Sequence, residues 1–235
     1  MKAPLRLTAT TTAFSLLALL AFTAAVPASA QRQPAGMVEG DKSLLNVLGF
    51  PDIKGDFERA IVCAGIVKTN GKMDCGGCYV IQPGDEVYVG AISQALKKAR
   101  WLPAVIDGKA VEAYLQYRVL FVQKGEDRRV GFLPNPGYVE NVEAYGPKHS
   151  AAQRVVDKEN WQKVCPNYAK FSVLAKAHVS FEGVPSSTSV SDGAGLPISD
   201  TCRQAIIDTL QRSLYIPATA DGETVPSTYT EPFGN

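Results

Sequence analysis

Two stretches of the sequence share one local pattern, Trp101-Leu102-Pro103-Ala104-Val105-Ile106-Asp107-Gly108 and Tyr215-Ile216-Pro217-Ala218-Thr219-Ala220-Asp221-Gly222. The two aromatic residues are 215 − 101 = 114 positions apart, and the proline, alanine, aspartate and glycine keep that offset. A proline disfavours helical backbone in the residue before it, so each stretch ends a helix, and Asp-Gly then turns the chain. Because an internal repeat determines the architecture, we predict two similar units.

The residues around these stretches predict the same order of elements in both units. In the second, alternation over 171–181, a Glu182-Gly183 turn and a return over 184–191 predict a hairpin. Ser199 then caps a helix, and a last strand begins near residue 225. In the first, a strand over 60–68, an Asn70-Gly71 turn, a helix over 87–100 and a last strand from residue 111 follow one another. The predicted class is α+β, with two small β-β-α-β domains, each an antiparallel sheet packed by one helix.

The N-terminus has the parts of a secretory signal peptide. Lys2 and Arg6 precede an apolar stretch over 13–26, and Ala28-Ser29-Ala30 gives a cleavage pattern. The alternative is an uncleaved anchor, because the uncharged run over 7–30 is long enough to span a membrane. Cleavage implies an exported, periplasmic protein without a membrane segment, in an oxidising compartment. We expect these divisions: signal peptide 1–30, linker 31–58, first domain 59–124, linker 125–168 with a short amphipathic helix within 151–164, second domain 169–235.

The composition argues against several classes of function. The chain has 235 residues and a formal net charge of +1, so it has no basic surplus for a nucleic acid. Its two histidines, His149 and His178, lie far apart, and we expect both to be solvated rather than catalytic. We therefore expect no enzyme activity, no metal and no cofactor.

The helix that ends in an aromatic residue, the Pro-Ala pair, the Asp-Gly turn and the closing strand resemble the TonB C-terminal domain family. The resemblance implies a periplasmic binding protein that takes a partner peptide or protein by β-strand addition, in connection with an outer-membrane transporter. Its motif residues are structural: Trp101, Pro103, Ala104, Asp107, Gly108, Tyr215, Pro217, Ala218, Asp221 and Gly222. A membrane-anchored energy transducer is an alternative, although no histidine precedes His149 and no proline-rich rod follows the apolar segment.

The resemblance places the partner beside a last strand, and the prolines discriminate between the two copies. Pro226 and Pro232 are an even number apart, so their missing N–H groups lie on one edge, whereas the strand over 111–122 contains no proline. We therefore expect the first domain to accept the peptide. The residues on one face of that strand are Val111, Ala113, Leu115, Tyr117, Val119 and Phe121. The alternative is that the two last strands pair with each other in one continuous sheet.

Five cysteines give the remaining predictions. A two-residue turn at Asn70-Gly71 pairs positions that sum to 141, so Cys63 faces Cys78; a bulge at Gly76-Gly77 would favour Cys75 instead. Cys165 and Cys202 form a second disulfide or remain separate thiols, and the odd cysteine is free or pairs between chains. The C-x-x-C from Cys75 to Cys78 leaves thiol-disulfide activity as a second alternative function.

Overall fold

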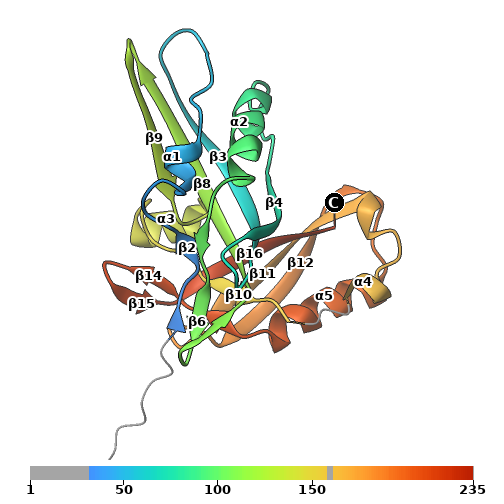
Figure 1. The fold of residues 1–235 in the computed structure, drawn as a ribbon. Coiled ribbons are helices and arrows are strands. Elements are labelled where there is room, and N and C mark those ends of the chain that lie inside the picture. The colour runs from blue at the N-terminus through green and yellow to red at the C-terminus, as the bar shows by residue number, and fades with distance from the viewer. Residues whose placement is uncertain (1–31, 158–160, 235) are drawn as a thin grey trace, which may run out of the picture.

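The computed structural model describes residues 32–157 and 161–234, which form a mixed α+β structure with several antiparallel sheets and few helices (Figure 1). The signal peptide expected at 1–30 lies outside the described residues. The first part of the chain contains β1 (Arg32–Gln33), β2 (Gly36–Met37), α1 (Leu44–Val47), β3 (Phe57–Val67), β4 (Met73–Cys78), α2 (Glu86–Leu96), β5 (Trp101–Leu102), β6 (Ala104–Ile106), β7 (Lys109–Val111), β8 (Ala113–Lys124) and β9 (Asp127–Leu133). The second part contains α3 (Val139–Tyr145), β10 (Gln153–Val155), α4 (Trp161–Val164), a 3-10 helix (Tyr168–Lys170), β11 (Phe171–Val179), β12 (Pro185–Gly195), α5 (Asp200–Arg212), β13 (Tyr215–Ile216), β14 (Ala218–Ala220), β15 (Glu223–Val225) and β16 (Ser227–Gly234).

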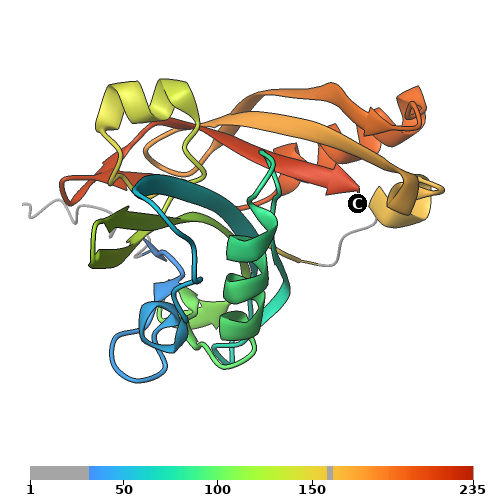
Figure 2. The same cartoon turned by 90° about the horizontal axis from the view of Figure 1, so that it is seen from above.

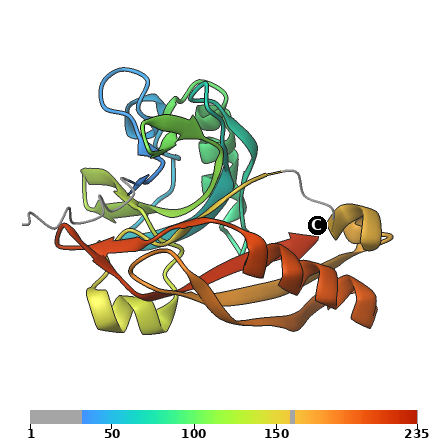
Figure 3. The ribbon, with the colours of Figure 1, turned by 90° about the horizontal axis from the view of Figure 1, so that it is seen from below.

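Two sheets contain most of the strands. The larger has six strands in the order β13-β10-β8-β3-β4, with β9 also paired to β8, and the smaller has the order β12-β11-β16. Figure 2 shows the smaller sheet on one side of β3 and α2 on the other. Figure 3 shows α5 lying along the smaller sheet, where it contacts β11 and β12. No helix in the described parts of the chain is long and apolar enough to cross a membrane.

The repeated motif has the same local structure in both copies. β5, β6, β7 and the first residue of β8 lie 114 residues before β13, β14, β15 and the first residue of β16 (215 − 101 and 227 − 113). Asp107 and Gly108 have φ of +50° and +75°, and Asp221 and Gly222 have φ of +51° and +86°. These left-handed conformations make the turns of the hairpins β6–β7 and β14–β15, as the Asp-Gly pairs predict.

The segments expected to be linkers are packed parts of the repeat. Gln33 of β1 pairs with Val105, and Ser150 pairs with Thr219, so the two partners again differ by 114 positions. The short helices α1 and α4 begin 161 − 44 = 117 residues apart. Each copy therefore begins with a short strand segment and a helical turn before its hairpin.

The segment expected to be the second linker, 125–168, is largely structured. Residues 127–133 form β9 in antiparallel register with β8. Within 151–164, where a short helix is expected, β10 comes first and the short helix α4 follows at 161–164. The expectation that His149 is solvated was wrong. His149 is buried, with its Nδ1 2.7 Å from the carbonyl oxygen of Gly146, because α3 and the strands around it enclose this segment.

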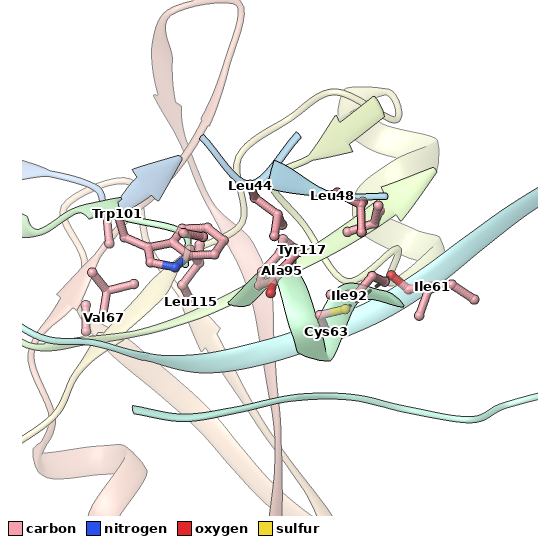
Figure 4. Close-up of a cluster of buried hydrophobic side chains, with 14 of the residues drawn as sticks. Leu44, Leu48, Ile61, Cys63, Val67, Ile92, Ala95, Trp101, Leu115 and Tyr117 are labelled. Atoms are coloured by element: carbon pink, nitrogen blue, oxygen red, sulfur yellow. Dashed lines mark hydrogen bonds between the residues drawn. The ribbon is translucent and has the colours of Figure 1, made fainter. Parts of the chain in front are cut away.

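Each copy has its own apolar core. In the first, Trp101 and Tyr117 lie 5.1 Å apart between ring centroids, among the buried side chains that Figure 4 shows. In the second, Tyr215 is buried in the equivalent position below α5, and its hydroxyl donates to the carbonyl oxygen of Leu210 at 3.0 Å. Ala104 and Ala218, which follow Pro103 and Pro217, are fully buried in both copies.

Both expected disulfides are present. Cys63 is bonded to Cys78 across the β3–β4 hairpin, and Cys165 is bonded to Cys202 between α4 and α5. Cys75 is the free, exposed cysteine among the described residues. The turn itself differs from the expectation, because Lys68 pairs with Lys72 around three residues, and Val67 then faces Met73 in a register that sums to 140. A register shift between Ala64 and Ile66 adds one position, as a bulge near Gly76 predicts, and so brings Cys63 opposite Cys78.

Candidate functional site: an open strand edge

The strand expected to accept a peptide is paired on both sides over most of its length. β8 pairs with β3 along one edge, from Gln123 to Ala113, and on the other edge it pairs with β9 and β10. The expected site is therefore wrong, because the chain after β8 turns back and occupies the edge itself. Of the six residues expected to bind the peptide, Val111 belongs to β7. The other five are fully buried in the first core: Ala113, Leu115, Tyr117, Val119 and Phe121. The two last strands do not pair with each other either, since β16 pairs with β11.

The outer edge of β16 is blocked by prolines and by α3. The side chain of Asn141 accepts from the Thr228 amide at 3.0 Å and donates to the Thr228 carbonyl at 2.8 Å. These bonds show that Thr228 turns its backbone groups away from β11. Pro226 and Pro232, an even number of positions away, lie on the same edge, as their spacing predicts. The Tyr145 hydroxyl also donates to the Pro226 carbonyl at 2.6 Å, so this edge offers little to another strand.

The edges of β12 and β4 are also unsuited to strand addition. Arg203 of α5 donates to the carbonyl oxygen of Val190 at 2.8 Å and to the carboxylate of Asp192 at 2.6 Å, so α5 covers the middle of β12. Ser187 in the same strand has a φ of +48°. In β4, Cys75 has a φ of +49°, and its amide donates to the side chain of Asp74. An irregular strand of this kind cannot present a regular row of donors and acceptors.

The outer edge of β9 is regular and open. Lys124 and Asp127 close its hairpin with β8, and pairing continues without a register shift to Arg118 and Leu133. In an antiparallel pair, alternate residues bond across the ladder, so Arg129 and Gly131 point their backbone groups at β8. Arg128, Val130 and Phe132 then point theirs away. Within residues 32–157 and 161–234, no hydrogen bond uses those outward groups.

Figure 1 shows β9 at an edge of the larger sheet. Contacts of its side chains hold it in place. Val130 and Phe132 pack against the first core, and Phe132 stacks on Tyr117 with 5.3 Å between ring centroids. The Arg128 guanidinium lies 5.4 Å from the centre of the Phe50 ring. Because the backbone is already extended and fixed, an incoming strand would bind without ordering β9 first.

A second group of polar residues lies buried where the two sheets meet, and it is structural. Arg154 of β10 donates from Nε and Nη2 to the two carboxylate oxygens of Glu231, both at 2.7 Å. The Tyr229 hydroxyl donates to the same carboxylate. Burial raises the pKa of Tyr229 and the pKa of Tyr114 well above the ordinary value, so both stay neutral. The two charges are paired and buried, and they join β10 of the larger sheet to β16 of the smaller one. This arrangement fits a structural role better than a reactive centre.

The cysteine motif does not have the geometry of a redox centre. Cys78 is bonded to Cys63 rather than to Cys75, so the C-x-x-C does not form a disulfide of its own. Partial burial, followed by the charge of Asp74, raises the pKa of the Cys75 thiol above its ordinary value. A raised pKa lowers the thiolate population, whereas reactive cysteines have depressed pKa values.

Two further features carry little chemistry. A cavity of about 680 Å³ between β10 and α5 is lined by apolar side chains such as Val156 and Leu214. Five charged residues also line it, and most of them are engaged in ion pairs: Asp208 pairs with Arg212 at 3.2 Å, Arg154 with Glu231 and Glu112 with Lys68, and Asp157 is the fifth. The described residues contain no group of three or more histidine, cysteine or acidic side chains placed to hold a metal ion.

Comparison with known proteins gives no relative: no family model, no curated protein and no solved structure matches this chain.

Proposed function

We propose that this chain is an exported, non-enzymatic binding protein that takes an extended segment of a partner as an additional strand beside β9. The observation that supports this most is the regular row of outward backbone groups at Arg128, Val130 and Phe132. Main-chain hydrogen bonds of this kind bind an extended peptide with little demand on its sequence. The two disulfides indicate an oxidising environment, which is consistent with export to the periplasm.

The resemblance to the TonB C-terminal domain family supports the same mode of binding. On this proposal the chain contains two tandem TonB C-terminal-like units, and the equal spacing of β5 to β8 and β13 to β16 supports that division. The partner is then a protein or peptide such as a segment of an outer-membrane transporter. The difference from the expectation is the acceptor strand, because β9 follows the last strand of the first unit and takes its edge.

Substituting proline for an outward residue tests the acceptor edge. In Val130→Pro the outward N–H is lost while the inward bonds of Arg129 and Gly131 to β8 remain. Losing one hydrogen bond of about 1 kcal/mol, together with the steric effect of the ring, weakens binding by roughly fivefold or more. The probe is a fluorescein-labelled peptide of alternating threonine and valine, seven residues long, and the readout is fluorescence anisotropy.

The matched control is Val190→Pro, which makes the same change at an outward position of another edge strand, β12. We expect Val190→Pro to bind the probe like the unchanged protein. If both proline variants weaken binding equally, or if Val130→Pro has no effect, β9 is not the acceptor. Circular dichroism of both variants verifies that each remains folded.

A further inference from the structure

Gly131 leaves an open notch on β9, on the face of the sheet that points away from the first core. A Cβ atom placed on Gly131 would meet only the side chain of Leu120, at 3.6 Å and 3.9 Å. Gly131 has no positive φ, so the absence of a side chain here is not required by the backbone. A strand added beside β9 would therefore find an uncovered apolar surface at this position.

The residues around the notch define what it would accept. Leu120 on β8 and Leu133 on β9 are both half-buried and form an apolar floor. Arg129, two positions before Gly131, lies on the same face and is exposed. The Asp127 carboxylate accepts hydrogen bonds from Nε of Arg129 at 2.8 Å and from Nη2 of the same side chain. These bonds hold the guanidinium by one edge, so its flat faces stay available.

We propose that the partner strand places an aromatic side chain opposite Gly131, over Leu120 and beside Arg129; this inference rests on the proposed function. Gly131 bonds toward β8, so a residue opposite it on the outer side occupies a non-hydrogen-bonded pair, where side chains approach most closely. An aromatic ring across from a strand glycine covers the backbone that the glycine leaves exposed. Its face also attracts the guanidinium of Arg129.

Other side chains fit the notch less well. A small side chain leaves Leu120 uncovered, and a basic one meets Arg129 with the same charge. An acidic side chain would meet Arg129, but the Asp127 carboxylate already pairs with that guanidinium. The partner class is therefore an extended peptide with an aromatic residue flanked by β-branched residues.

The test compares two peptides on three proteins. The peptides are Thr-Val-Thr-Phe-Thr-Val-Thr and Thr-Val-Thr-Ala-Thr-Val-Thr, and the proteins are the unchanged chain, Gly131→Val and Gly77→Val. A Cβ atom at 131 makes an ordinary contact with Leu120, and a Cβ atom at 77, on β4, meets nothing within 4 Å, so we expect both variants to fold. We expect the phenylalanine peptide to bind the unchanged chain roughly two- to tenfold more tightly than the alanine peptide.

The ratio of the two affinities decides the outcome. It should fall to about one on Gly131→Val and stay unchanged on Gly77→Val. If both peptides bind the unchanged chain equally and Val130→Pro still weakens both, the aromatic preference is refuted while strand addition stands. If neither peptide binds, or if Val130→Pro changes nothing, strand addition at β9 fails and this inference fails with it.

Discussion

Replacing Glu231 with glutamine leaves the Arg154 guanidinium buried beside a neutral amide. The side chains of Arg154 and Glu231 are only 2% and 7% exposed, and two hydrogen bonds of 2.7 Å join them. Arg154 also lies 5.7 Å from the ring centre of Phe233, so it cannot leave for water without disturbing the second core. Removing one partner of such a pair costs about 3–5 kcal/mol, because the remaining charge stays desolvated.

This cost is large compared with the total stability of a domain, which is about 5–15 kcal/mol. For a chain of this size each kcal/mol lowers the melting temperature by roughly 2–4 °C, so Glu231→Gln should lower it by about 6–20 °C. Urea unfolding followed by tryptophan fluorescence should show a lower midpoint with an unchanged slope. An unchanged slope indicates that the native state has the same compactness and is only less stable.

Two variants make the interpretation specific. Glu223→Gln makes the same chemical change at an exposed position on β15 and should leave the midpoint unchanged. The triple variant Arg154→Met, Tyr229→Phe and Glu231→Leu removes both charges together with the hydroxyl that donates to Glu231, and it should recover most of the loss, because apolar groups replace the whole cluster. A cost of Glu231→Gln below about 1 kcal/mol, or a triple variant that is less stable than Glu231→Gln, would contradict this prediction.

Three further predictions concern the second disulfide, the free cysteine and the edge of β16. Replacing Cys165 and Cys202 with serine opens a loop with a sequence separation of 37 and should cost about 4 kcal/mol in urea unfolding; a cost below 1 kcal/mol would contradict this. Cys75 should react with iodoacetamide at pH 8 more slowly than a cysteine in an unfolded peptide, because its raised pKa lowers the thiolate fraction, and Asp74→Asn should speed the reaction. Asn141→Ala should increase hydrogen exchange in the first part of β16 and destabilise the chain by about 1–3 kcal/mol, because a backbone donor and acceptor lose their partners; unchanged exchange would show that the side chain does not hold this edge.

Features defined by neighbouring residues were predictable from the sequence. Asn70-Gly71 lies in the β3–β4 turn, although the Cys63–Cys78 register also needs the shift between Ala64 and Ile66, and Ser199 accepts from the Cys202 amide as the expected helix cap. Both depend on a few positions along one stretch of chain, where turn and cap chemistry act directly. The repeated Asp-Gly turns belong to the same category.

Features defined by long-range pairing were not predictable in the same way. β1, β2 and β10 each contain two or three residues, too few to show a hydrophobic period, and their partners lie far along the chain. β9 contains Gly131 and precedes Pro134, which gave it the composition of a loop. The two copies also differ in how the same positions are stabilised, since the second copy has a disulfide where the first has apolar packing. Leu48 and Tyr88, the counterparts of Cys165 and Cys202 at offsets of 117 and 114, are buried apolar residues in the first core.

The position of the open edge follows from competition between the chain and its partner. A strand that follows β8 after a turn of two residues pays a small loop-closure cost, and its effective concentration beside β8 is about millimolar or higher. A free peptide present at lower concentration would have to displace β9 against that advantage, so β8 is unavailable even though it contains no proline. The same segment between the repeats supplies Asn141, which closes β16. Residues 125–149 thus close the last strands of both copies, and the outer edge of β9 itself stays open.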